Sequence, residues 1–317
     1  MGYSKAEARG KDQEKGVDLW LAWAIRVTAG LLALAAVSLG LYWYGERYTH
    51  PNTPAVDRDT EIVENQIRQQ PNDPRLRVAA ANLYLEKGRY DDAAAQAEQV
   101  LQASPGNLAA LLALGQIYER KGQPDRALGY LSRAVELNKD NPMARSSLQL
   151  ALIHRTMGSI HLEQGRPQEA VDQLKEALEI DRGNADTLQL LGNALAAQGQ
   201  LDEAVESYRQ ALRLVPDFPE VYRDLYRAYE RKGDRDRANF AWGMVHYSAG
   251  EYDQAVESLR KAAQALPDMA EVHLGLAMVY EKKGLKAEAL EEYRKAQTLD
   301  AGSIAAKQGI GRLGGRQ

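Results

Sequence analysis

The chain has one long apolar segment, whereas the rest of its sequence is largely polar and charged. Val27 to Tyr44 are 18 residues without a charge, VTAGLLALAAVSLGLYWY. A helix of that length spans roughly 27 Å, close to the thickness of the hydrocarbon core of a bilayer. Trp20 and Trp23 precede the segment and three aromatic residues close it, and such rings favour the two headgroup interfaces. The pattern predicts a single transmembrane helix over residues 19–45.

Two other interpretations of the apolar segment fit less well. A buried core helix would need apolar sequence beside it to pack against, and none flanks it. A cleaved signal peptide would have a shorter apolar region ending in small residues, where this chain has aromatic ones. No cysteine follows, which excludes a lipoprotein anchor. We therefore expect an uncleaved anchor.

The distribution of Lys and Arg around the segment predicts its orientation. Basic residues near a membrane helix mark its cytoplasmic side. Those before it are Lys5, Arg9, Lys11, Lys15 and Arg26, and the near ones after it are Arg47 and Arg58. We expect the helix to lie in a bacterial inner membrane, with residues 1–18 as a cytoplasmic tail. The larger C-terminal part is then expected on the extracytoplasmic side. The alternative keeps that larger part in the cytoplasm.

One face of the predicted transmembrane helix carries small residues. Arg26, Ala29, Ala33, Ala36 and Gly40 recur every three or four positions, which places them in one stripe. Small residues allow a second helix to approach closely in lipid, and an arginine near the helix end can meet a partner carboxylate. The stripe predicts a packing face; the alternative is that alanine is simply common in membrane helices.

After a linker at residues 46–58, short turns with glycine recur at a nearly constant period. The turn glycines are Gly88, Gly122, Gly165, Gly199, Gly233, Gly250 and Gly284, with steps of 34, 43, 34, 34, 17 and 34 residues. An alanine follows each glycine five positions later. Glycine supplies the positive φ that ends a helix. Each turn is therefore expected to join two helices.

Small and large residues recur at fixed places within this period. With the first repeat starting at Pro74, the eighth position is small and the eleventh is large, often tyrosine. The small residues are Ala81, Gly115, Gly158, Gly192, Gly243 and Ala277, and the tyrosines are Tyr84, Tyr118, Tyr229 and Tyr280. A small residue lets two helices cross closely. On these residues the chain from about 60 to 302 resembles the tetratricopeptide repeat family, whose period is 34 residues.

The resemblance implies an all-α fold, a superhelix of helical hairpins (an α-solenoid) over residues 59–302 after the transmembrane helix. Its expected parts are a half repeat at 60–71, repeats at 74–107, 108–141, 142–184 and 185–218, an irregular repeat at 219–269, a last repeat at 270–302, and a capping helix with a tail at 303–317.

Two steps depart from the period. The 43-residue step holds nine extra residues near 142–150, and we expect them to lengthen one first helix to about Pro142–Gln164. The 17-residue step is half a repeat, and residues 234–248 fit the templates of both a first and a second helix. We expect the alternation of helices to break there and to kink the superhelix; the alternative is a deletion absorbed without visible change.

Composition and motifs exclude several classes of function. Ala, Leu, Glu, Gln, Arg and Lys dominate, as in helical proteins, and a net charge of −4 gives no electrostatic case for nucleic acid, which would need a concentrated basic face. Cysteine is absent, which excludes disulfides and thiolate catalysis. The repeat register assigns His154, His161, His246 and His273 to packing positions, and no catalytic or phosphate-binding motif occurs. We expect no enzyme activity, no cofactor, no metal and no small-molecule substrate.

The resemblance also indicates where a partner would bind, because in that family the first helices line the concave surface. Its groove positions here include Asn82, Asn193, an arginine ladder at Arg223, Arg227 and Arg231, and an apolar set at Phe240, Met244 and Tyr247. The ladder could meet an acidic segment, or be an ordinary solvated face. The apolar set could anchor a partner, or be core. The lysine–asparagine clamp of members that hold a C-terminal carboxylate is not reproduced.

The sequence therefore favours a membrane-anchored scaffold or assembly factor that binds other polypeptides through its repeats. The alternative is a permanent structural subunit of a larger membrane complex, which the stripe of small residues would suit.

Overall fold

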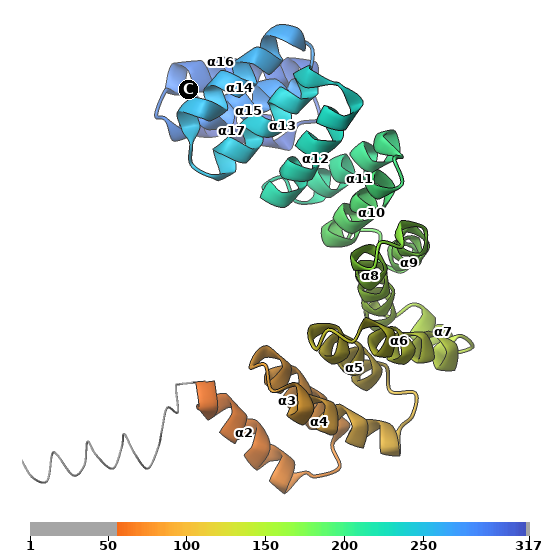
Figure 1. The fold of residues 1–317 in the computed structure, drawn as a ribbon. Helices are drawn as coiled ribbons and strands as arrows, with labels where there is room; N and C mark the ends of the chain where they lie inside the picture. Colours follow the sequence, from red (N-terminus) through yellow and green to blue (C-terminus); the bar gives the residue numbers. More distant parts are fainter. Residues whose placement is uncertain (1–55, 315–317) are drawn as a thin grey trace, which may run out of the picture. The chain divides into compact units, whose positions relative to one another are not determined.

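The computed structural model describes residues 56–314, and every regular element in that range is an α-helix (Figure 1). No helix among these residues has the length and apolar character needed to cross a membrane. The predicted tail at 1–18, the transmembrane helix at 19–45 and the stripe from Arg26 to Gly40 lie outside the described residues.

The first described helix, α2 (Val56–Gln69), belongs to a unit of its own, residues 1–71. A helix here was expected from residue 60, so the prediction of a helix is confirmed. Its start was wrong by four residues, because the helix already begins within the predicted linker. The interpretation of α2 as the second helix of a half repeat stays a prediction.

The second unit, residues 72–317, is a series of helices in which each long helix packs on the next long one. The regular part holds four pairs: α3 (Pro74–Glu86) with α4 (Tyr90–Ala103), α5 (Leu108–Arg120) with α6 (Pro124–Asn138), α8 (Leu148–Glu163) with α9 (Pro167–Ile180), and α10 (Ala185–Ala197) with α11 (Leu201–Leu214). The C-terminal part holds α12 (Pro219–Lys232), α13 (Arg235–Ser248), α14 (Tyr252–Ala265), α15 (Ala270–Lys282), α16 (Lys286–Leu299) and α17 (Ile304–Leu313).

The predicted turn glycines all have the left-handed conformation. Their φ angles lie between 69° and 82°, from Gly88 to Gly284. An L-residue with a Cβ atom is strained at such angles, whereas glycine is not. In each case the glycine follows the end of a helix within three residues and turns the chain into the next one. The spacing of these glycines therefore sets the spacing of the helices.

The small residue at the eighth position lies where the two helices of a pair cross. A Cβ atom on Gly115 would lie 2.4 Å from Leu131 of the second helix, and one on Gly192 would lie 2.4 Å from Tyr208. Gly158 stands in the same relation to Leu174, at 2.6 Å. In each pair the large side chain sixteen positions after the small residue fills the crossing. This confirms the prediction that close helix crossing restricts the eighth position to small residues.

The nine extra residues do not form one helix from Pro142 to Gln164, so the predicted bounds were wrong; α8, with 16 residues, is only three residues longer than α3, α5 and α10. The chain instead forms the short helix α7 (Pro142–Arg145), breaks, and begins α8 at Leu148. The break follows from two adjacent serines. The Ser147 Oγ accepts a hydrogen bond from the Leu150 backbone N–H at 3.2 Å, so Ser147 caps a new helix, while the Ser146 hydroxyl bonds back to the Pro142 carbonyl. Serine side chains that bond the local backbone favour a cap over a helix interior.

The 17-residue step breaks the alternation of first and second helices, as expected. Toward α14, helix α13 behaves as a first helix, because a Cβ atom on Gly243 would lie 2.6 Å from Leu259. Toward α12, it occupies the place of a second helix, with Trp242 sixteen positions after Tyr226. One helix thus serves in two successive pairs. The kink expected from this arrangement stays a prediction.

The last helix, α17, lies within residues 303–317, where the sequence predicted a capping helix and a tail. Its Gly309 lies against the ring of Tyr293, where a Cβ atom would be only 2.4 Å from the ring. The ring, 1% exposed, is therefore covered by α17 just as the crossing residues of earlier pairs are covered by later helices. This covering is what a capping helix supplies at the end of a repeat array.

Candidate protein-interaction face

The candidate interaction face is the row of first helices, since these helices touch one another along the array. Helix α3 contacts α5, α5 contacts α8, α8 contacts α10, and α10 contacts α12; α15 likewise contacts α13 and α17. Side chains on this row can therefore bond from one repeat to the next. We call this row the first-helix face.

Polar groups join successive repeats across this face. Arg155 of α8 pairs with Asp186 of α10 at 3.2 Å. The Gln189 amide of α10 donates to Asp224 of α12 at 2.9 Å, and Arg227 donates to the other oxygen of that carboxylate at 3.3 Å. The Asp224 side chain is only 14% exposed. The Asp224 carboxylate is thus bonded to groups of the array itself.

Asn193 was predicted as a partner-binding residue, but its side chain already has a partner in the array. It is half-buried, and its Oδ1 accepts a hydrogen bond from the Tyr208 hydroxyl at 2.7 Å. Burial raises the pKa of Tyr208, so this hydroxyl keeps its proton and remains a donor. Asn193 therefore orients Tyr208 at a helix crossing. The other predicted asparagine, Asn82 of α3, is exposed.

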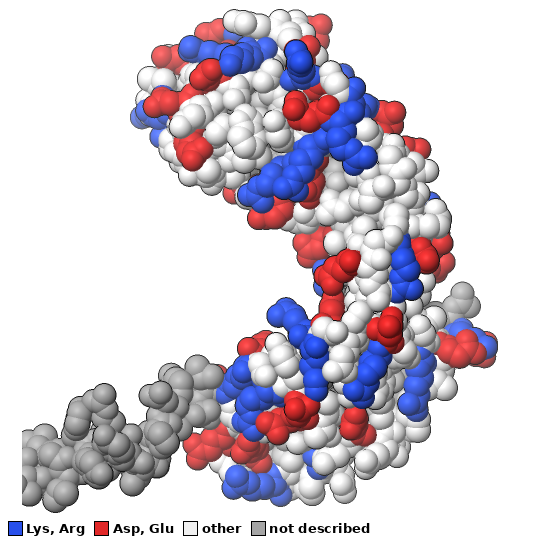
Figure 2. Space-filling view, in the orientation of Figure 1, with Lys and Arg blue, Asp and Glu red and all other residues white. Residues whose placement is uncertain are grey.

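The predicted arginine ladder lies exposed along α12. Arg227 pairs with Asp224, and Arg231 donates to the Ala196 carbonyl of α10 at 2.8 Å. Arg223 has no hydrogen bond or ion pair with any residue of the described part. Figure 2 shows a continuous run of Lys and Arg side chains over α12 and its turn into α13. The ladder therefore leaves at least one cation available to a partner.

Two of the three residues in the predicted apolar set are buried in the core, so their prediction as partner-binding residues was wrong. Phe240 is 6% exposed and Met244 is 3% exposed. Because α13 sits between α12 and α14, the face it would present as a first helix is covered: the Phe240 ring meets Tyr222 of α12 edge-on, with centroids 6.2 Å apart. Tyr247 is half-buried and lines a small hollow with Met278 and Glu281.

Sequence reasoning missed an acidic pair near the other end of this face. Glu119 lies in the last turn of α5 and Glu163 ends α8, and the two carboxylates are close enough to repel each other. Burial, with that repulsion added, raises the pKa of Glu119. The pair could have been predicted from the sequence, because both glutamates fall at positions of the repeat that face the groove. The face thus carries two mutually repelling carboxylates at the ends of α5 and α8 and exposed arginines on α12.

The buried histidines are packing residues, as their register predicted. His154, His161 and His273 are each less than 10% exposed. The His154 Nδ1 lies 2.8 Å from Gln173, and the His273 Nδ1 lies 2.6 Å from Glu292, nineteen positions later in both repeats. Burial lowers the pKa of His161, with nearby Arg166 adding to the effect.

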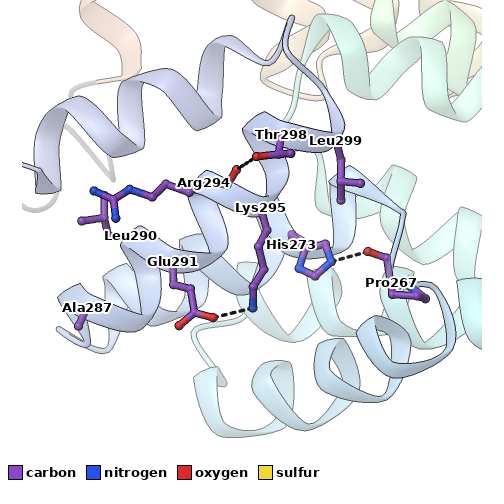
Figure 3. A pocket seen from close by; sticks show the side chains of 9 residues that line it. All are labelled: Pro267, His273, Ala287, Leu290, Glu291, Arg294, Lys295, Thr298 and Leu299. Atoms are coloured by element: carbon purple, nitrogen blue, oxygen red, sulfur yellow. Dashed lines mark hydrogen bonds and ion pairs between the residues drawn. The ribbon is translucent and has the colours of Figure 1, made fainter.

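A hollow of about 890 Å³ lies along α16 (Figure 3). It runs along one side of α16, from Ala287 to Leu299, and reaches the chain at Pro267 and His273. Its Lys295 amine is held by Glu291 and Glu292 at 2.7 and 2.8 Å, and its Thr298 hydroxyl bonds to the Arg294 carbonyl. These polar groups are bonded to one another within α16.

The periodic crossings and glycine turns agree with three family models. Two described as tetratricopeptide repeat match residues 84–151 with 161–207 and residues 240–304, and one described as TPR repeat matches residues 192–233. The array is built of tetratricopeptide repeats. Such repeat proteins are generally scaffolds for protein–protein interaction and not enzymes, and all three models describe repeats.

Similar proteins are known among sequences and structures. The interferon-induced protein with tetratricopeptide repeats 2 of Cricetulus griseus is 29% identical over 99 residues, which are 31% of this chain and 21% of that protein. This chain thus spans about a fifth of that relative's length.

Two solved structures resemble the repeat array. The crystal structure of MamA is 28% identical, covering 58% of this chain and 96% of that one, with a TM-score of 0.45. The structure of PilW, described as a type IV pilus biogenesis factor, is 19% identical, covering 75% and 98%, with a TM-score of 0.46.

Proposed function

We propose that this protein is a membrane-anchored scaffold or assembly factor that binds partner polypeptides on the first-helix face of its repeat array. The observation that carries the proposal is the exposed arginine ladder on α12, in which Arg223 has no partner among the described residues. An unpaired, exposed guanidinium beside other cations attracts carboxylates and forms paired hydrogen bonds with them.

The anchor is the uncharged segment Val27–Tyr44, and the proposed topology follows from the basic residues before it. In this proposal the N-terminus is cytoplasmic, the membrane is a bacterial inner membrane, and the repeats lie outside. Protease treatment of spheroplasts tests the topology: digestion of the repeats supports it, and protection of the repeats until the membrane is broken contradicts it.

A second candidate is a permanent structural subunit of a membrane complex. The stripe Arg26, Ala29, Ala33, Ala36 and Gly40 favours it, because a simple tether needs no packing face. Extraction in mild detergent followed by native sizing separates the two. Co-migration with fixed partners at constant stoichiometry supports a subunit, whereas substoichiometric, varied partners support an assembly factor.

Charge reversal tests the binding face itself. The full-length chain with Arg223→Glu and Arg227→Glu should lose most of the polypeptides that the unaltered chain captures. A matched control reverses two exposed cations on second helices, Arg133→Glu and Lys175→Glu, and should capture the same set as the unaltered chain. Equal capture by both variants, or equal loss, would contradict the proposal.

A further inference from the structure

Trp242 is exposed at a position that is buried in the other repeats. As a second-helix residue it corresponds to the side chains that fill helix crossings, which are 0–1% exposed: Ala97, Leu131, Leu174, Tyr208, Leu259 and Tyr293. As a first-helix residue it directly precedes the eighth position of the repeat, like Ala80, Leu114, Met157, Leu191, Leu225 and Leu276, which are at most 8% exposed. Trp242 is 37% exposed. By either template it belongs inside.

The exposure follows from the missing half repeat. In regular pairs the next first helix covers the crossing residue; Gly275 of α15 lies against Leu259 in this way. After the α12–α13 pair no such separate helix follows, because α13 is itself the first helix of the next pair. The outer side of the Trp242 ring is therefore left without a cover.

The uncovered ring belongs to an ordered aromatic cluster. Tyr226 of α12 lies against the Trp242 ring with centroids 4.8 Å apart and planes tilted by 35°. The His246 ring meets Trp242 edge-on, also at 4.8 Å, and is itself held by Glu251 at 2.6 Å. A tryptophan fixed by two neighbours loses little rotamer freedom on binding, which favours its use as an anchor.

The charges beside this cluster are mainly positive. Arg223 and Arg227 stand three positions before and one after Tyr226 on α12, both exposed. The nearest acid on that helix, Asp224, is engaged by Gln189 and Arg227, and Glu251 by His246. Glu230, exposed and four positions after Tyr226, is the acid of α12 that helix geometry places beside the cluster, whereas Glu220 lies near the start of the helix. The cluster thus continues the arginine ladder as a surface that is aromatic in one part and cationic in the other.

We infer that this surface binds an acidic peptide segment that carries one aromatic side chain. The carboxylates of the segment pair with Arg223 and Arg227, and its aromatic ring stacks on the uncovered side of Trp242. This inference rests on the proposed function and names the class of segment recognised. It assigns the recognition to the break in the repeat alternation, because among the helix pairs of residues 74–299 only α12–α13 leaves its crossing residue uncovered.

Fluorescence of Trp242 tests the inference directly. The other three tryptophans are Trp20, Trp23 and Trp43, so replacing them with phenylalanine in the full-length chain leaves Trp242 as the sole reporter. The probes are three 12-residue peptides. The first contains Asp, Glu and Ser around one central Phe. The second replaces this Phe with Ala, and the third replaces each Asp and Glu of the first with Lys. The first should shift Trp242 emission to shorter wavelength and reduce its quenching by acrylamide severalfold. The second should bind about tenfold more weakly, and the third should leave the emission unchanged.

Two variants separate this inference from the proposed function. Trp242→Ala should weaken binding of the first peptide about tenfold, whereas Leu299→Ala, which removes a similarly exposed side chain on α16, should not change it. The inference is overturned if the first peptide leaves the emission of Trp242 unchanged in the chain that keeps this residue, or if the Trp242→Ala variant binds that peptide with full affinity. If Arg223→Glu with Arg227→Glu still loses captured partners in that case, the proposed function stands. If Trp242→Ala proves unfolded by circular dichroism, the emission and quenching of the unaltered site decide.

Discussion

The pairs α10–α11 and α12–α13 follow the same sequence template with different side chains at the crossing. In the first, Gly192 lies against Tyr208, which is 1% exposed. In the second, Tyr226 lies beside Trp242, which is 37% exposed. A small residue against a large one closes the crossing, whereas two large aromatic rings stack instead. The comparison teaches that a small residue paired with a large one buries the crossing side chain, whereas two large rings leave one of them partly exposed.

The break also changes which helices meet at long range. Ion pairs between neighbouring repeats join residues about 30 apart, as Lys121 and Asp91 do. Arg209 of α11, however, pairs with Glu271 of α15 at 2.9 Å, although the two are 62 residues apart. A shared helix shortens the array by half a repeat, and so brings α15 within reach of α11. The irregular region is thus integrated into the array and is not a hinge between independent parts.

The largest expected effect is at a closed crossing. Leu259→Ala should lower the free energy of unfolding by about 2–5 kcal/mol, because the side chain is fully buried between α13 and α14. Trp242→Ala should lower it by less than half as much, although the ring is larger, because one side of the ring is exposed. Urea unfolding monitored by circular dichroism measures both. Equal losses would mean that the α12–α13 crossing is as closed as the others.

A smaller effect is expected from adding a methyl group at the crossing of α13 with α14. Gly243→Ala should cost about 1–3 kcal/mol, since the new Cβ would lie 2.6 Å from Leu259 Cγ and 3.2 Å from its backbone nitrogen. The matched control is Gly129→Ala in α6, where nothing lies within 4 Å of the new Cβ. That change should stabilise by up to about 1 kcal/mol, since alanine favours a helix. A neutral Gly243→Ala would remove the claim that α13 is a first helix.

The regular region should also show a pH dependence through His161. Its folded pKa lies below the ordinary value of 6.5, so the unfolded chain binds the proton more readily. The free energy of unfolding should therefore fall as pH drops below about 6.5. His161→Tyr places the residue that Tyr84 and Tyr118 supply in other repeats, and should abolish that part of the dependence. A pH profile from 7.5 to 5.0 that is identical in both proteins would contradict this.

The smallest expected effect concerns the ion pair across the break. Arg209 and Glu271 are both nearly half exposed, so their coupling should be about 0.2–1 kcal/mol. A double-mutant cycle with Arg209→Ala and Glu271→Ala measures it at low salt and again at high salt, where the coupling should shrink. The adjacent exposed pair Arg213 and Glu206, within α11 alone, serves as the control for a local interaction. A coupling of zero at low salt would argue that α11 and α15 do not meet in solution.

Most of the array could be predicted from the sequence because its signals are local. Glycines at positive φ, small residues at crossings and the closing helix each act within one hairpin, so their spacing reveals them. The split at Ser146 and Ser147 was missed, because the length of the insertion gave no indication of a cap.

The candidate site was predictable only in part, because burial depends on neighbouring repeats. Arg223 was found as an exposed cation, since helix periodicity alone places it outside. Phe240 and Met244 were misassigned because α12 covers them, and Asn193 because Tyr208 bonds to it. The exposure of Trp242 could not be predicted, because the first-helix and second-helix templates both place this position in the core. Its exposure appears only when α13 is seen to serve two pairs at once.

Hydrogen exchange of the full-length chain, with and without a captured partner polypeptide, tests the central claim most directly. Added protection is predicted in α10, α12 and α13, with the strongest change on α12 around Arg223 and on α13 around Trp242. The second helices α6, α9 and α16 should exchange as in the free chain. Protection confined to those second helices, with α12 and α13 unchanged, would contradict the account.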